Sequence, residues 1–114
     1  MAYLSPCIRD DMLVYQQDGQ EPLILVNTPA WFCWLNSAST FNFSSDSGGF
    51  TARKEQAGHK RGNWYWRAYC KQGDKLFSRY LGKSETLSLE CLRIAATTLS
   101  KKTREYSRSQ KGQL

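Results

Sequence analysis

Aromatic and cationic side chains alternate along one short stretch of the chain, residues 64–71, whose sequence is WYWRAYCK. Because successive side chains of a β-strand point to opposite faces, Tyr65, Arg67, Tyr69 and Lys71 would share one face of a strand. Tyrosine rings can stack on planar bases, and a guanidinium group can donate paired hydrogen bonds to a phosphate or a base edge. The spacing therefore predicts a surface that binds nucleic acid.

Two further strands are predicted beside this stretch, so that the three form an antiparallel sheet. The first spans residues 50–55 and the third spans residues 75–81, joined to the middle strand by a basic loop (QAGHKRGN) and a tight turn (QGD). Arg53 and Arg79 are predicted to point outward with Arg67, because burial of an unpaired guanidinium is costly. The predicted nucleic-acid-binding residues, on this face and at its rim and turns, are Arg53, Lys54, Lys60, Arg61, Tyr65, Arg67, Tyr69, Lys71, Lys75, Arg79 and Lys83.

The positive charge of the chain is concentrated in the same region. The 114 residues carry a net charge of +6, but residues 1–49 hold one basic and five acidic side chains, whereas residues 50–83 hold nine basic and two acidic ones. A basic middle and an acidic front indicate a polyanion-binding module with a separate front segment. Two plainer interpretations stay open: an ordinary soluble surface, and a solvated sheet face whose tyrosines and arginines stack only on one another.

A helix that follows Gly82 is predicted to cover the other face of the sheet. Ser88 has the residue type of an N-cap, and the charge of Lys101 suits the C-terminal end. The apolar stripe of this helix consists of Leu89, Leu92, Ala96 and Leu99, with Ala95 beside it. The side chains expected beneath it are Trp64, Trp66, Ala68 and Cys70. Residues 103–114 are polar and basic, and they are predicted to form a disordered tail.

The first half of the chain predicts short strands. Residues 12–20 and 22–27 are consistent with a hairpin, whereas residues 1–10 carry no clear signal and are expected to be mobile. Residues 37–43 alternate phenylalanine with polar residues, as a further strand would. The segment SSDSGG, residues 44–49, is the best candidate for a boundary between a front segment and the basic sheet.

A short aromatic helix is predicted between these strands. Thr28-Pro29 suits a helix start, since threonine caps and proline fits the first turn. Trp31, Trp34 and Leu35 then share one helical face. Two interpretations stay open: a set of core side chains, and a partner-binding aromatic surface made of Trp31, Phe32 and Trp34.

These elements predict an α+β fold, namely a three-stranded antiparallel sheet packed on a C-terminal helix and preceded by a short N-terminal hairpin and helix. The expected divisions are an N-terminal extension (residues 1–47), the sheet and helix (residues 48–102) and the basic tail (residues 103–114).

Motifs for catalysis or for a cofactor are not recognised. His59 has no partner motif, and the sequence holds no G-x-S-x-G, phosphate-binding loop or H-E-x-x-H pattern, so we expect no enzyme activity and no cofactor. The four cysteines form no C-x-x-C pair, which argues against a zinc site and favours free thiols in a reducing compartment. Without a signal peptide or a long apolar run, a cytoplasmic protein is expected.

The strings FTARKE, RGNWYWRAY and KLFSRYLGKSETLSLECL, preceded by WFCWLNSASTFNF, resemble a small module near the N-terminus of some LuxR/MalT-like bacterial transcriptional regulators. This resemblance covers about residues 30–100, but the ATPase, repeat and helix-turn-helix regions of those long proteins have no counterpart here. More loosely, three strands followed by a helix are similar to AP2-like and integrase arm-binding DNA-binding domains. That second resemblance implies a sheet laid in the major groove.

The expected function is therefore non-enzymatic binding of duplex DNA, as a bacterial regulator of transcription or an accessory factor of a mobile element. Two alternatives stay open: an RNA- or single-strand-binding subunit of a ribonucleoprotein, and a protein–protein interaction module within a larger assembly. The oligomeric state and the recognition sequence are not predicted.

Overall fold

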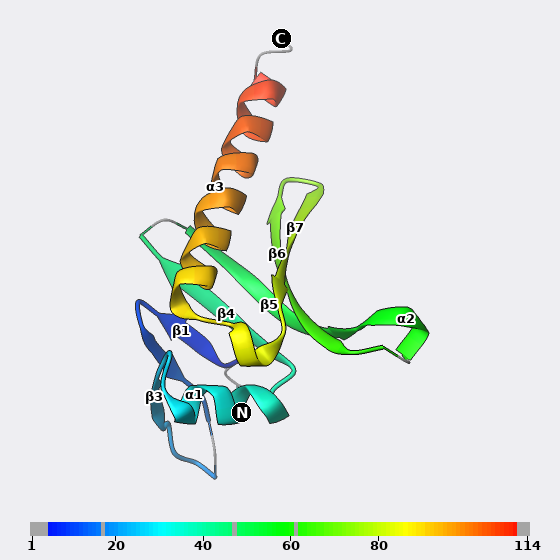
Figure 1. Ribbon diagram of the computed structural model, residues 1–114. Helices are drawn as coiled ribbons and strands as arrows, with labels where there is room; N and C mark the ends of the chain where they lie inside the picture. Colours follow the sequence, from blue (N-terminus) through cyan, green and yellow to red (C-terminus); the bar gives the residue numbers. More distant parts are fainter. Residues whose placement is uncertain (1–4, 17, 47, 61, 112–114) are drawn as a thin grey trace.

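Seven strands form one mixed sheet in this computed structural model, which describes residues 5–16, 18–46, 48–60 and 62–111 (Figure 1). In chain order they are β1 (Cys7–Arg9), β2 (Met12–Val14), β3 (Leu23–Leu25), β4 (Thr40–Ser45), β5 (Gly48–Gln56), β6 (Trp64–Gln72) and β7 (Lys75–Gly82). Their order across the sheet is β3-β2-β1-β4-β5-β6-β7. The predicted three-stranded sheet is thus the last three strands of a seven-stranded sheet, and the α+β class is confirmed.

The helices are α1 (Pro29–Ser37), α2 (Ala57–Lys60) and α3 (Leu89–Lys111), with a single 3-10 turn, η1 (Ser84–Thr86), before α3. Side chains of α1 and α3 join one core with the inward side chains of the sheet, so both helices cover the same face. The long α3 runs across β4–β7, and its C-terminal half continues beside the β6–β7 hairpin (Figure 1). None of the helices in the described part of the chain is long and apolar enough to cross a membrane.

Strand β1, Cys7–Arg9, corrects the expectation of mobility for the described part of residues 1–10, whereas residues 1–4 lie outside the described part of the chain. β1 pairs in parallel with β4, placing Ile8 beside Phe43, and it pairs antiparallel with β2. The β2–β3 hairpin is confirmed. β4 and β5 also form a hairpin, paired from Thr40↔Arg53 to Ser45↔Gly48. The expected boundary near residues 44–49 therefore falls inside a hairpin of one continuous sheet.

Helix α1 begins where the sequence predicts, because the Thr28 hydroxyl accepts a hydrogen bond from the Trp31 backbone N–H at 3.4 Å. Trp31 is fully buried, and its indole N–H donates to the Leu87 carbonyl at 2.8 Å. Trp31 therefore cannot be part of a partner-binding surface, and the core interpretation holds for it. Phe32 and Trp34 are half-buried and pack against the same core.

Helix α3 carries the predicted stripe, since Leu92, Ala95, Ala96 and Leu99 are all fully buried. It does not end near Lys101 but continues to Lys111, which corrects the predicted disordered tail over that range. Tyr106 explains the extension, because its ring packs against Phe77 of β7 and its hydroxyl donates to Asp74 at 2.9 Å. The last three residues lie outside the described part of the chain.

Candidate nucleic-acid interface

The face of β5, β6 and β7 that points away from α3 carries the alternating aromatic and cationic side chains. Cross-strand partners share a face of a sheet, so the register arranges these side chains in rows. One row is Arg53–Arg67–Tyr80, and the next is Thr51–Tyr69–Ser78. Glu55 lies opposite Tyr65 at one end, and Lys71 lies opposite Leu76 at the other. No described helix packs on this surface, which we call the open face.

Glu55 reaches from one end of the open face and bonds to two of its tyrosines. Tyr65 donates its hydroxyl hydrogen bond to one oxygen of the Glu55 carboxylate at 2.9 Å, and Tyr69 donates to the other oxygen. The hydrogen bond to Glu55 raises the pKa of Tyr65. Burial raises the pKa of Tyr69, and the bond to Glu55 adds to that effect. The Glu55 carboxylate therefore favours the protonated form of both phenols and fixes their rings in place on the sheet.

The cations of the open face keep access to solvent. Arg53 is exposed, and its guanidinium carbon lies 5.9 Å from the centre of the Tyr69 ring. Arg67 is half-buried in the middle strand, directly opposite Arg53. Like charges that face each other across two strands cost stability, about 0.2–1 kcal/mol. The Arg53 guanidinium lies toward the Tyr69 ring, and the Glu55 carboxylate bonds to Tyr65 and Tyr69 beside this row.

Arg79 does not lie on the open face, which corrects its predicted outward position. It pairs with Ala68, whose side chain is fully buried under α3, and it lines a small hollow with Cys91 at the start of that helix. Phe77 shares its face and packs on Tyr106, so the alternation of β7 turns Tyr80 outward instead. A half-buried arginine at the sheet edge can extend its charged end to water.

Two predicted lysines also lie on the helix side. Lys54 donates hydrogen bonds to the carbonyls of Leu35 and Asn36, at 2.6 and 3.2 Å, and so caps the end of α1. Burial lowers the pKa of Lys54, and its ammonium nitrogen lies 5.4 Å from the Trp66 ring centre. Lys75 is placed over the rings of Phe77 and Tyr106. Neither lysine projects from the open face as a phosphate contact would.

Of the remaining predicted positions, only Lys83 has a described side chain. Lys83 is exposed just after β7. Lys60 belongs to α2, although its side chain lies outside the described part, as does the whole of Arg61. Trp64 was predicted to lie beneath α3 with Trp66, yet it is 55% exposed whereas Trp66 is fully buried. Helix α3 therefore does not cover the first residue of β6.

The structure adds Tyr80 and Glu55 to the set predicted from the sequence. Tyr80 is 57% exposed, and its ring centre lies 5.5 Å from that of Tyr65. The sequence pattern already places Glu55 on the outward side of its strand, but its two tyrosine partners depend on the β5–β6 register. Of the predicted residues, the open face brings together Arg53, Tyr65, Arg67, Tyr69 and Lys71.

The open face extends beyond the rest of the sheet. Pairing of β5 with β4 stops at Arg53, whereas pairing with β6 continues to Gln56, so the β5–β6 hairpin and α2 project past β4 (Figure 1). The end of the β6–β7 hairpin projects in the same manner beyond the last pair with β5, Thr51↔Tyr69. Three neighbouring strands are about 4.8 Å apart, so the width of the ridge that they form is comparable to the width of the major groove, about 12 Å.

Comparison of the chain with protein-family models, with curated proteins and with solved structures gives no significant match. The function is therefore inferred from the geometry and charge of the open face.

Proposed function

We propose that the protein binds duplex DNA through the open face of β5, β6 and β7 without catalysing a reaction. In this role it acts as a bacterial regulator of transcription or an accessory factor of a mobile element. The observation that carries the proposal is the row Arg53–Arg67–Tyr80, in which two arginines face each other across adjacent strands. A polyanion that lies along this row would contact both guanidinium groups and be attracted to their charge.

Each part of the open face has a role in this proposal. The two arginines contact phosphates or guanine edges, to which a guanidinium can donate two parallel hydrogen bonds. Lys71, exposed near the projecting end of β6, contacts the phosphate backbone. Glu55 holds Tyr65 and Tyr69 in place, which lowers the entropy cost of ordering the surface on binding.

A second candidate function follows from the position of Tyr80. Its exposed ring beside Tyr65 offers a platform on which unpaired bases can stack, as in single-strand-binding proteins. This feature favours RNA or single-stranded DNA, and Tyr80→Ala tests it. The substitution weakens single-strand binding by about 1–3 kcal/mol if bases stack there, and it leaves duplex binding nearly unchanged if the arginines dominate.

The protein-interaction alternative loses its main anchor, because Trp31 is fully buried. Its remaining members, Phe32 and Trp34, are half-buried and pack on the core. A partner surface built on these two side chains alone would be small.

The deciding experiment is a titration of the purified protein with duplex DNA, single-stranded DNA and RNA at low and moderate salt. We expect tightest binding to the duplex, with an affinity that falls as salt rises because phosphate contacts release counterions. Arg67→Ala is expected to weaken that binding by about 1–3 kcal/mol. Absence of binding to all three polymers at low salt would overturn the proposal, and a clear preference for single strands would select the second candidate.

A further inference from the structure

The two edge strands of the sheet, β3 and β7, expose apolar side chains to solvent. Leu23 and Leu25 of β3 are 63% and 45% exposed, and Leu76 and Tyr80 of β7 are 59% and 57% exposed. These four are among the six large apolar side chains that are exposed in the described part of the chain. Apolar side chains on a sheet edge favour the addition of another strand, because pairing removes their area from water.

The exposed side chains of both edges lie on one face of the sheet, the face away from the helices. In β3, Ile24 packs against the core and pairs with the buried Leu13. Leu23 and Leu25, on either side of Ile24, therefore point to the opposite face. The exposed pair of β7 belongs to the open face, which is the same side of the continuous sheet.

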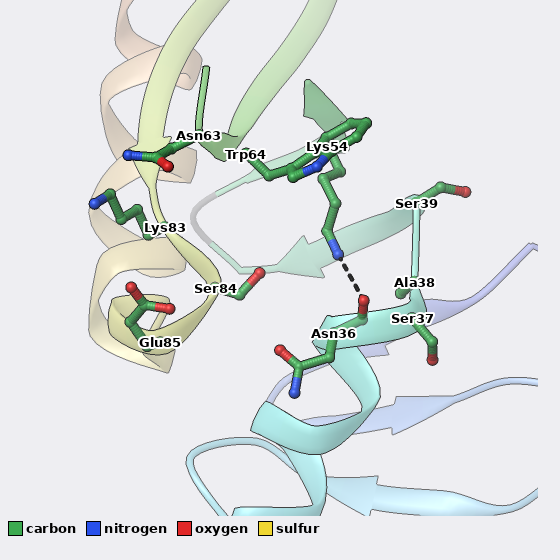
Figure 2. Close-up of a pocket in the computed structure, with 10 residues that line it drawn as sticks. All are labelled: Asn36, Ser37, Ala38, Ser39, Lys54, Asn63, Trp64, Lys83, Ser84 and Glu85. Carbon is green, nitrogen blue, oxygen red and sulfur yellow. Dashed lines mark hydrogen bonds between the residues drawn. The ribbon is translucent and has the colours of Figure 1, made fainter. Parts of the chain in front are cut away.

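The other two exposed apolar side chains, Trp64 and Ile94, lie on the helix side of the sheet. Trp64 lines a hollow between the end of α1 and the connection from β7 to α3 (Figure 2). Figure 2 shows Asn63 and Lys83 of the same lining pointing away from the indole, so these polar groups do not converge on one ligand. The exposed apolar area that shares one face is therefore that of the two edges.

The two edges carry opposite charge. Residues 5–27, which include β1, β2 and β3, hold one basic side chain and four acidic ones, namely Arg9 against Asp10, Asp11, Asp18 and Glu21. Residues 71–83, which include β7, hold four basic side chains and one acidic one, namely Lys71, Lys75, Arg79 and Lys83 against Asp74. Two copies that meet through unlike edges attract each other, whereas two copies that meet through like edges repel.

The strand directions allow unlike edges to pair. Strands β1 and β4 are parallel and the other neighbouring pairs are antiparallel, so β3 runs opposite to β7. If the sheet continues from β7 of one copy to β3 of the next, with the same face outward, these two strands are antiparallel. The leucines of β3 then lie on the same face as Leu76 and Tyr80 of the neighbouring copy, where side chains of adjacent strands contact each other.

We infer that the partner of each edge is a second copy of this chain, and that copies associate head to tail, with β3 of one paired to β7 of the next. The inference goes beyond the proposed function, since the contact needs no nucleic acid. A head-to-tail contact of this kind forms short chains when the rotation between copies does not close a ring. Strand β3 has three residues, so the contact is small and belongs to the weak interfaces that bury less than about 1,200 Å².

Sedimentation velocity of the full chain without nucleic acid tests this contact over a series of protein concentrations, at low and at moderate salt. The average mass should rise with concentration, and added salt should weaken association because it screens the unlike edges.

Two variants each remove one edge: Leu23→Gln with Leu25→Gln removes the β3 edge, and Leu76→Gln with Tyr80→Gln removes the β7 edge. Each is expected to weaken self-association by about tenfold or more. A mixture of the two should form a complex of one copy of each, because each variant supplies the edge that the other lacks. Trp64→Gln, which removes exposed apolar surface from the helix side, is the matched control and should associate like the unchanged protein.

The outcomes separate the possible contacts. A mixture that associates when neither edge variant does so alone supports the head-to-tail contact. A β7-edge variant that still dimerises means that β3 pairs with β3, a β3-edge variant that still dimerises means that β7 pairs with β7, and either result overturns the inference. Monomers at all concentrations, or folded variants whose mixture stays monomeric, overturn it as well.

Thermal melting checks that each variant is folded, and the single substitutions Leu23→Gln and Leu76→Gln replace a double variant that is not. The sedimentation assay contains no DNA. Its failure is therefore distinct from failure of duplex binding at the open face, which the titration measures.

Discussion

Replacement of Arg53 by glutamine tests the open face with little disturbance of the fold. Glutamine keeps part of the side-chain length of arginine and removes its charge. The change removes the contact with the Tyr69 ring, worth about 0.5–1 kcal/mol at an exposed site. It also relieves the opposition to Arg67, worth about 0.2–1 kcal/mol. Because the two effects oppose each other, the free energy of unfolding should change by less than about 0.8 kcal/mol.

The effect on binding should be much larger. Loss of one arginine contact is expected to cost about 1–3 kcal/mol, which is roughly a 5- to 150-fold increase in the Kd for duplex DNA. If Arg53 contacts a phosphate, the slope of log K against log salt should fall by about 0.9. Fluorescence polarisation across a salt series measures both quantities, and urea denaturation measures the stability.

Arg93→Gln is the matched control, because it removes the same charge from an exposed position on α3, on the other side of the sheet. The net charge of the two variants is identical. If both variants lose affinity equally, binding follows the overall charge of the protein rather than the open face. That result, or an unchanged affinity in Arg53→Gln with a folded protein, would refute the reasoning.

Three further predictions concern the supports of this surface. The pKa values of Tyr65 and Tyr69 are raised in the folded protein, so their protonated forms stabilise the fold. This stabilisation is fully present below about pH 10 and is lost as pH rises through the folded pKa values. The free energy of unfolding should therefore fall in alkali. Glu55→Gln should bring both pKa values back toward ordinary ones and weaken this alkaline loss, as measured by urea denaturation and tyrosinate absorbance; an unchanged titration would contradict the role of the carboxylate. Lys54→Met should lower the free energy of unfolding by about 1 kcal/mol, because the carbonyls at the end of α1 lose a charged donor, and it should leave duplex affinity unchanged; a large loss of affinity would instead restore this lysine to the binding surface. Tyr106→Ala should cost about 1 kcal/mol through loss of its ring contact with Phe77 and speed amide hydrogen exchange in β7, whereas unchanged exchange would mean that the C-terminal part of α3 does not support the hairpin.

Local patterns in the sequence predict much of the basic half correctly. The alternation in residues 64–71 sets the faces of β6, because side-chain period in a strand depends only on the backbone. Arg67 and Tyr69 are therefore placed correctly before any tertiary contact is known. The start of α1 is equally local, since a threonine cap and a proline act within one helical turn.

The pattern of β7 shows where local information ends. Phe77 and Arg79 share one face of this strand, and Leu76 and Tyr80 share the other. Either orientation has a cost, because one buries an arginine and the other exposes a phenylalanine. The contact between Phe77 and Tyr106 decides the choice. That contact requires α3 to continue well beyond Lys101, and the only local sign of the extension is the absence of glycine and proline up to the end of the helix.

The sequence by itself determined the α+β class, the faces of β5 and β6 and the concentration of positive charge in residues 50–83, because these depend on residue type and on spacing along the chain. Only the tertiary structure decided that β1 joins β4, that Glu55 bonds to two tyrosines and that Lys54 caps a helix. Each of these contacts joins residues that are distant in the chain. Their free energy depends on packing and register in three dimensions, which no short pattern contains.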